Sequence, residues 1–203
     1  MKTLAFFSQK GGSGKTTLAI HAAVAALDGG QSVALIDSDP QQSSASWGKT
    51  RQCEAPVVAK ASASNIDQAL DAARAEAVDL CLIDCPPHAM AGVAHLIEVS
   101  DFVVIPCQPS ALDVAAAGRA VDMVQAAGKR FAFVVNRAPM RAPENRETVE
   151  TLAQLGPVCP VLISERRAYA RALTGGQAVS EFESGGKAAM EIGAFWSWLT
   201  TQL

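Results

Sequence analysis

The sequence has no long apolar run and no closely paired cysteines, and both absences exclude classes of protein. The first apolar run, residues 3–8, is too short to cross a bilayer and leads directly into a glycine-rich stretch. We therefore expect neither a signal peptide nor a transmembrane helix, and a cytoplasmic location. The five cysteines show no C-x-x-C spacing, which is typical of small buried thiols rather than of a metal cluster. The three histidines, His21, His88 and His95, are too scattered to predict a metal site.

Internal repeats and low-complexity linkers are also missing from the sequence. The 203 residues, of which 49% are hydrophobic, are enough to bury one sizeable core. We expect a single domain that covers residues 1–203.

An excess of positive charge is missing as well, because the formal net charge is −3. That value by itself disfavours a nucleic-acid partner, but the distribution of charge favours one. Residues 119–171 contain nine basic and five acidic side chains, a balance of +4, so the rest of the chain carries −7. Such an asymmetry can place a positive surface on an acidic protein.

Apolar runs of strand length alternate with alanine-rich helical stretches along the whole chain. This alternation is typical of an α/β fold with a mostly parallel sheet flanked by helices. The expected strands are 3–8, 32–37, 57–60, 79–84, 102–106, 130–136 and 158–163. The expected helices are 15–28, 44–51, 65–77, 92–99, 111–127, 144–155, 165–173 and 185–203.

The stretch from Gln9 to Thr17 follows the first strand and is typical of a phosphate-binding loop. Glycines allow backbone N–H groups to close around phosphates, and the helix that follows points its positive dipole end at them. In such a loop Lys15 contacts the β- and γ-phosphates, and the Thr16 hydroxyl ligates Mg²⁺. The predicted nucleotide-binding residues of the loop are Lys10, Gly11, Gly12, Ser13, Gly14, Lys15, Thr16 and Thr17.

The form x-K-G-G-x-G-K-[ST]-T resembles the deviant Walker A loop of the ParA/MinD superfamily, whose fold is a deviant P-loop NTPase fold. The similarity covers nearly the whole chain, and it implies that ATP and Mg²⁺ are the cofactors. It also implies that Lys10 crosses a dimer interface to the phosphates held by the partner subunit. There it would add positive charge where the transition state spreads negative charge.

The resemblance is greatest to short ParA partition proteins that lack an N-terminal DNA-binding extension. It implies an ATPase that is weak alone and forms a homodimer around ATP. The dimer would bind DNA without sequence preference and associate with the nucleoid, until a ParB-like protein or a cargo adaptor stimulates hydrolysis. The cargo stays open: a plasmid, a chromosome or a protein assembly.

Carboxylates follow two of the apolar strands, where an open parallel sheet places its ligands. Asp84 ends strand 79–84 and is predicted to be a Walker B residue that holds Mg²⁺ through water, with a helix cap as the alternative. By resemblance to the D-x-D motif of the family, Asp39 orients the attacking water and Asp37 supports the Mg²⁺ shell. The alternative for Asp37 and Asp39 is a turn before a proline. The catalytic candidates are thus Lys10, Lys15 and Asp39.

Two further residues are candidates for contact with the adenine. The amide of Asn136, at the end of strand 130–136, could read the edge of the base, and Pro160 could lie against the ring. An asparagine in a loop without a ligand is the alternative. Residues 84–87, Asp-Cys-Pro-Pro, resemble the switch of the family that responds to the γ-phosphate.

Arginines of the basic segment are the candidates for DNA contact. Arg167 and Arg171 are four residues apart on an expected helix and share one face. The candidates are Arg137, Arg141, Arg166, Arg167 and Arg171, and a solvated basic surface without a partner is the alternative.

Two other function classes of the same superfamily stay open. A MinD-like membrane-cycling ATPase needs a basic amphipathic C-terminal helix. Residues 195–203 contain no Lys or Arg, so we expect this tail to pack on the core without stable membrane association. A metabolic or metal-insertion ATPase needs a second substrate pocket, paired cysteines or a His-rich tract, and the sequence shows none of these.

Overall fold

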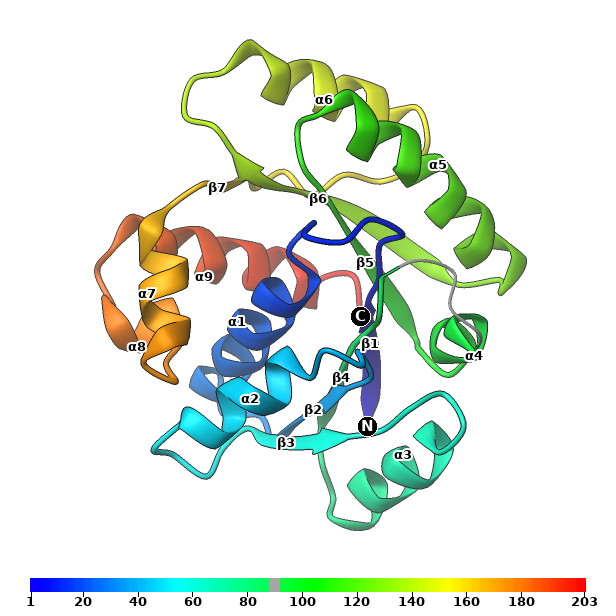
Figure 1. The fold of residues 1–203 in the computed structure, drawn as a ribbon, viewed down its shortest axis with the longest axis vertical. Coiled ribbons are helices and arrows are strands. Elements are labelled where there is room, and N and C mark those ends of the chain that lie inside the picture. The colour runs from blue at the N-terminus through cyan, green and yellow to red at the C-terminus, as the bar shows by residue number, and fades with distance from the viewer. Residues whose placement is uncertain (88–91) are drawn as a thin grey trace.

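The computed structural model describes residues 1–87 and 92–203, so His88 lies outside the described residues. In the described chain, seven parallel strands form one sheet in the order β3-β2-β4-β1-β5-β6-β7 (Figure 1). The strands are β1 (Lys2–Phe6), β2 (Val33–Asp37), β3 (Val57–Lys60), β4 (Leu80–Asp84), β5 (Phe102–Cys107), β6 (Arg130–Ala138) and β7 (Ile163–Ser164). The predicted α/β fold with a parallel sheet is confirmed.

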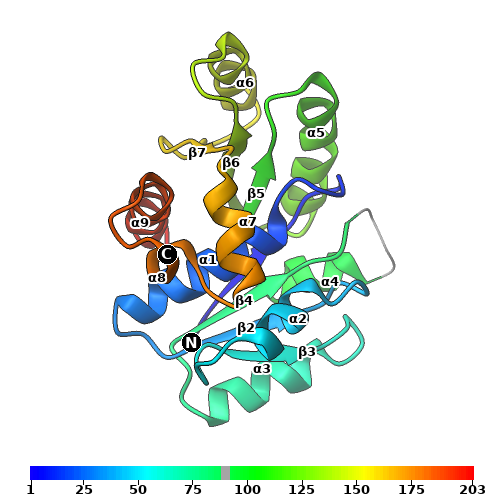
Figure 2. The ribbon, with the colours of Figure 1, turned by 60° about the vertical axis from the view of Figure 1, so that its left-hand side comes forward.

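Helices cover both faces of this sheet (Figures 1 and 2). They are α1 (Lys15–Asp28), α2 (Ser43–Thr50), α3 (Ile66–Ala75), α4 (Val93–Glu98), α5 (Ala111–Ala126), α6 (Pro143–Ala153), α7 (Arg167–Thr174), α8 (Val179–Phe182) and α9 (Lys187–Thr200). None of the described helices combines the length and apolar character that a membrane crossing requires.

Two hydrophobic clusters form the core, one on each face of the sheet. Successive strand residues point to opposite faces, so Leu4 and Phe6 join one cluster while Ala5 and Phe7 join the other. The first cluster packs α1, α2, α7, α8 and α9, and the second packs α3, α4, α5 and α6. Strands β2, β4 and β5 are buried at every residue, which explains why their sequences are apolar except for the aspartates that end β2 and β4.

The C-terminal helix α9 belongs to the first cluster. Phe195 and Leu199 are fully buried there, and Trp196 is 8% exposed. The expectation that this tail packs on the core is confirmed.

Two expectations from the sequence were wrong in detail. The strand expected at 158–163 is reduced to β7, and Val158 makes only an isolated bridge with Phe133. Pro157 and Pro160 explain the difference, because proline has no N–H for the ladder. The second error concerns the thiols: Cys53 is exposed, whereas the other four cysteines are buried.

His21 on α1 is fully buried, and it provides a pH-dependent test of the packing of α1 on α8. Its Nδ1 accepts a hydrogen bond from the Val179 N–H at 3.3 Å, and its ring centroid lies 5.2 Å from that of Tyr169. Burial lowers the pKa of His21 from 6.5 to about 3. Below pH 6.5 His21 therefore binds a proton in the unfolded chain, whereas in the folded chain it stays neutral down to about pH 3.

We predict that His21 lowers the free energy of unfolding as the pH falls from about 6.5 towards 3, with a slope approaching about 1.4 kcal/mol per pH unit. His21→Leu should lose this part of the pH dependence, because leucine cannot bind a proton. Urea unfolding of both proteins at pH 7.5, 6 and 5 measures the difference in the free energy of unfolding. A difference that stays constant across these pH values would contradict the prediction.

Candidate nucleotide site

The segment between β1 and α1 lies at the carboxyl ends of the central strands and forms one wall of a cavity of about 660 Å³. From β1 the chain first continues to strands on one side of it, β2 to β4, and then crosses to β5 on the other side. Open α/β sheets bind ligands where the direction of the connections changes in this way. This wall contains Gly11, Gly12, Gly14, Lys15, Thr16 and Thr17. The opposite wall comes from β7 and α7 and contains Ser164, Glu165, Arg166, Arg167, Tyr169, Ala170 and Leu173.

Two glycines determine the path of the loop. Gly12 has φ +78° and Gly14 has φ +98°, in the left-handed region that side chains other than glycine rarely adopt. Gly14 is also the N-cap of α1 and provides no capping side chain. The first N–H groups of α1 are therefore available to an anion in the cavity.

Asn136, near the end of β6, holds this loop through a side-chain hydrogen bond. Its Nδ2 donates a hydrogen bond to the Ser13 carbonyl at 2.8 Å, and its side chain is buried. A Cβ on Gly14 would lie 1.9 Å from that Nδ2, so only glycine permits the approach. The geometry gives Asn136 a loop-supporting role that the sequence did not predict, and contact with an adenine edge stays a prediction.

Pro160, the other candidate for contact with the base, is exposed. It is not among the residues that line the cavity. Its position therefore provides no support for a contact with the base.

Lys15 begins α1 and is buried beside the loop. Its Nζ donates to the Lys10 carbonyl at 3.4 Å. Burial lowers the pKa of Lys15, while the nearby Asp84 and Asp39 act in the opposite direction. An anion in the cavity would offset the free-energy cost of burying the Lys15 charge, so the site suits a phosphate.

Lys10 is bound within its own chain. Its Nζ forms an ion pair with Asp113, and its side chain is 37% exposed. Asp113 lies in the first turn of α5 and also receives a hydrogen bond from the hydroxyl of Ser110. This partner was not predicted from the sequence, although the S-x-x-D pattern at 110–113 is a helix-capping signal. A contact of Lys10 with a second subunit requires this ion pair to open.

Asp37 and Asp84 are neighbours across the sheet, in register on β2 and β4. Both Asp37 oxygens accept backbone N–H groups, from Asp39 at 3.1 Å and from Ala45 at 2.8 Å. Asp37 thus holds the loop after β2, and its support of a Mg²⁺ shell stays a prediction. Asp39 lines the cavity, and its Oδ1 accepts from the Gln41 N–H at 2.9 Å.

Asp84 is the carboxylate whose chemistry fits a metal ion. Its Oδ2 accepts from the Ser44 hydroxyl at 2.7 Å, while its buried Oδ1 has no hydrogen-bond partner among the described residues. Burial raises the pKa of Asp84 to about 7, and the hydrogen bond from Ser44 opposes this shift. Thr16 lines the cavity, whereas Asp84 is buried and is not among the lining residues. Hard oxygen ligands of this kind suit Mg²⁺, which takes one or two protein ligands together with phosphate oxygens.

The arginines predicted to contact DNA fall into two groups. Arg166 pairs with Glu191 at 2.6 Å, and its side chain is only 20% exposed. Arg137 pairs with Glu165 at 3.0 Å and is 53% exposed. Arg141, Arg167 and Arg171 are exposed and have no ion pair with the described residues.

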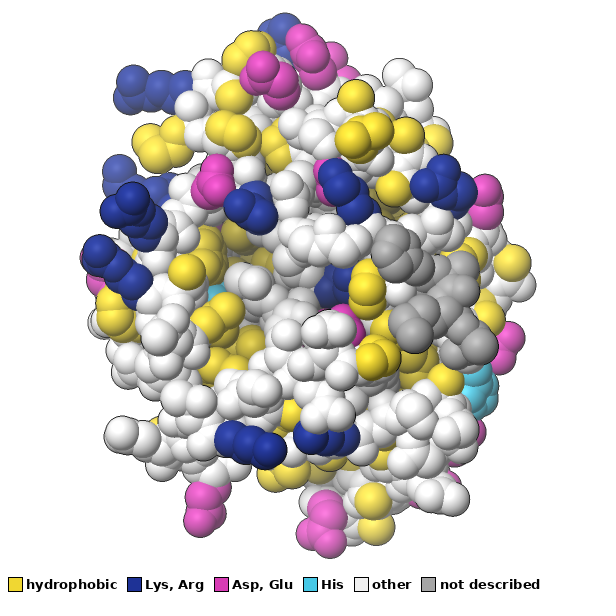
Figure 3. Space-filling view, in the orientation of Figure 1, with side chains coloured by type: hydrophobic (Ala, Val, Ile, Leu, Met, Phe, Trp, Pro, Cys, Tyr) yellow, Lys and Arg dark blue, Asp and Glu magenta, His cyan; other side chains and the backbone are white. Residues whose placement is uncertain are grey.

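Lys and Arg side chains gather along the left margin of the space-filling view, on the side of α7 (Figure 3). Arg137, Arg141, Arg167 and Arg171 have the exposure that contact with DNA needs, although Arg137 is paired with Glu165. Arg166 does not, because its side chain is mostly buried and is paired with Glu191.

We predict that Gly14→Ala weakens nucleotide binding much more than Gly12→Ala. Alanine at position 12 adds only backbone strain of about 1–2 kcal/mol, since no atom of the described residues lies within 4 Å of its Cβ. Alanine at position 14 also displaces the Asn136 amide. Titration calorimetry with Mg-ATP measures both affinities. Equal losses would show that the contact with Asn136 is unimportant, and Gly14→Ala with Asn136→Ala should recover part of the loss.

Comparison with known proteins identifies the family. The CobQ/CobB/MinD/ParA nucleotide binding domain matches residues 4–179. Maintenance of carboxysome distribution protein A from Halothiobacillus neapolitanus is 30% identical over 200 residues, covering 93% of this chain and 91% of the relative.

Two solved structures have the same fold. The cell division ATPase MinD of Pyrococcus furiosus superposes with a TM-score of 0.81 at 18% identity, covering 100% of this chain and 99% of that one. Apo McdA from Cyanothece superposes with a TM-score of 0.80 at 19% identity, covering 98% and 99%. The chain belongs to the CobQ/CobB/MinD/ParA nucleotide-binding family, as its phosphate loop indicated.

Proposed function

We propose that this protein is a ParA-type ATPase that forms a dimer around ATP and binds DNA without sequence preference. The observation that carries the proposal is the different surroundings of two lysines in one loop. Lys15 is buried and lines the cavity, whereas Lys10 does not line it, is partly exposed, and is paired among the described residues with Asp113. This difference supports assigning Lys15 to the bound nucleotide and Lys10 to a second subunit.

The residues around the cavity have separate tasks in this proposal. The loop N–H groups and Lys15 hold the phosphates, and Thr16 and Asp84 would hold Mg²⁺. That ion, when bound, neutralises charge on the phosphates. Asp39 orients the attacking water, and Lys10 of each subunit adds positive charge at the nucleotide of the other.

The cargo is inferred from the relatives. The relative from Halothiobacillus neapolitanus maintains carboxysome distribution, and the IncC proteins of Escherichia coli are more distant relatives. We infer that the chain positions a large cytoplasmic assembly or a plasmid on the nucleoid, with a ParB-like protein or a cargo adaptor stimulating hydrolysis. The burial of Phe195 and Leu199 on the core favours this reading over a membrane-cycling ATPase, because these side chains are unavailable to a bilayer.

We predict that Lys15→Ala and Lys10→Ala fail at different steps. Lys15→Ala should abolish binding of ADP and ATP, because the charge nearest the β- and γ-phosphates is lost. Lys10→Ala should bind ADP within about threefold of the wild type, since its Nζ is paired with Asp113 in the single chain. It should nevertheless fail to dimerise with ATP. Calorimetry with ADP and light scattering with ATP separate the two steps.

Equal loss of ADP affinity in both variants would rule out action of Lys10 across a dimer. Asp113→Asn serves as a matched control, because it weakens the ion pair of Lys10 and keeps the lysine. This variant should dimerise with ATP at least as well as the wild type.

We predict that reversing Arg141 and Arg171 to glutamate removes ATP-dependent DNA binding and preserves ATP-dependent dimerisation, because these two exposed residues do not line the nucleotide cavity. Each lost phosphate contact should reduce the slope of log affinity against log salt by about 0.9. The matched control is the reversal of Arg74 and Lys129 to glutamate. These residues precede β4 and β6, at the amino ends of the strands and away from the carboxyl ends that carry the cavity. Fluorescence anisotropy with duplexes of unrelated sequence measures affinity and salt slope. An unchanged slope in the Arg141 and Arg171 variant would place the DNA surface elsewhere.

A further inference from the structure

The cavity wall opposite the phosphate loop is built differently from the loop itself. Ser164, Arg166 and Tyr169 line this wall, together with the apolar side chains of Ala170 and Leu173. The wall also contains Glu165 and a second cation, Arg167, so its charged groups lie among aromatic and aliphatic ones, whereas the loop side presents backbone N–H groups and Lys15.

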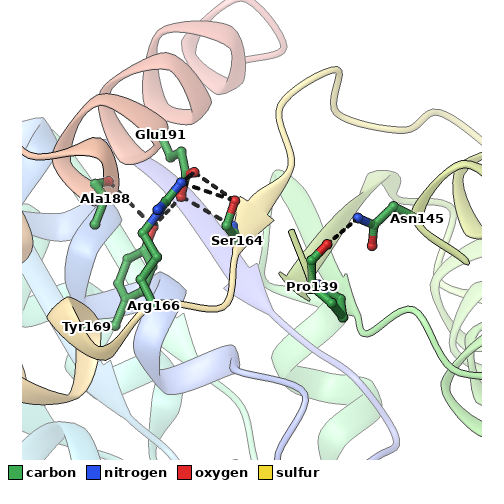
Figure 4. Close-up of polar contacts among 7 residues, drawn as sticks. All are labelled: Pro139, Asn145, Ser164, Arg166, Tyr169, Ala188 and Glu191. Carbon is green, nitrogen blue, oxygen red and sulfur yellow. Dashed lines mark hydrogen bonds and ion pairs between the residues drawn. The ribbon is translucent and has the colours of Figure 1, made fainter. Parts of the chain in front are cut away.

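Glu191 on α9 is the common partner of three residues of this wall (Figure 4). Its Oε1 accepts from the Arg166 Nη2 at 2.6 Å, from the Arg166 Nε at 3.1 Å and from the Ser164 hydroxyl at 2.8 Å. Its Oε2 accepts from the Ser164 N–H and from the Tyr169 hydroxyl, both at 3.2 Å. One carboxylate therefore connects β7, the N-cap of α7 and the first turn of α7 to α9.

The ion pair with Glu191 determines which kind of ligand group Arg166 can bind in the cavity. The side chain of Glu191 is only 16% exposed, so the ion pair is shielded from solvent and neutralises the guanidinium. Because Glu191 already balances the charge of the Arg166 guanidinium, a phosphate would add little binding energy there. The guanidinium is still planar, and a planar group stacks on flat aromatic rings. At the part of the wall formed by Arg166, Ser164 and Tyr169, a base is therefore a better match than a phosphate.

We propose that Glu191 is a positioning residue for the nucleobase: it holds Arg166, Ser164 and Tyr169 in the arrangement that receives the base and ribose of the nucleotide. This inference rests on the proposed ATP binding. Glu191 itself does not line the cavity, so it acts through the wall residues. A wall that is already ordered loses less conformational freedom when the base binds, and affinity rises accordingly.

Glu191→Gln tests the proposal, because glutamine has nearly the same shape but no charge for Arg166. Two ligands are compared by calorimetry: Mg-ATP and Mg-tripolyphosphate, which has the phosphates but no base. We expect the ATP dissociation constant to rise by about tenfold, as for loss of a charged hydrogen bond, and that of tripolyphosphate to stay unchanged. Glu183→Gln is the matched control, since Glu183 is exposed and its side chain has no hydrogen bond to the described residues.

A double-mutant cycle with Arg166→Gln tests whether Glu191 acts through the arginine. If it does, Glu191→Gln adds little further loss of ATP affinity to a protein that already lacks Arg166. Arg166→Lys provides a second route if Glu191→Gln does not fold, because lysine keeps the charge but loses the planar group. It should weaken ATP and spare tripolyphosphate.

Equal weakening of both ligands, or unchanged affinity for ATP, would overturn the assignment. Failure of the proposed function gives a different result, because the wild-type protein would then bind neither ATP nor tripolyphosphate.

Discussion

The amide of Asn136 donates to the Ser13 carbonyl from beneath the phosphate loop, at 2.8 Å. This contact joins the end of β6 to the turn that precedes α1, two segments 123 residues apart in the chain. It requires a residue without Cβ at Gly14, since a methyl group there would overlap the amide. The direction of the first N–H groups of α1, and with it the anion-binding side of the cavity, depends on this contact.

Charge near the cavity is mostly neutralised within the chain. Lys10 pairs with Asp113, and Arg166 pairs with Glu191. Lys15 and Arg167 are the exceptions, because both line the cavity without an ion pair among the described residues. Lys15 is buried near carboxylates and directs an anionic ligand to the loop side, whereas Arg167 and Arg171 are exposed cations of α7.

Most of the fold was predictable because it depends on local patterns. The predicted helix 15–28 and strand 57–60 match α1 and β3 at both ends. In both cases a glycine pair or a proline adjoins an apolar stretch and marks its boundary. The short β7 and the extra helix α8 were not predicted, since prolines interrupt the one and the other is a single turn whose stability comes from packing on α1 and α9.

The sequence by itself determined the phosphate loop, the parallel sheet and the family, because these follow from glycine spacing and from hydrophobic runs within short windows. The tertiary structure alone decided the partner of Lys10, the supporting role of Asn136 and the pairing of Arg166 with Glu191. Each of these contacts joins residues that are 25 or more positions apart. The physical reason is that a charged or amide side chain takes its role from the group it meets across the fold, and no local pattern specifies that group.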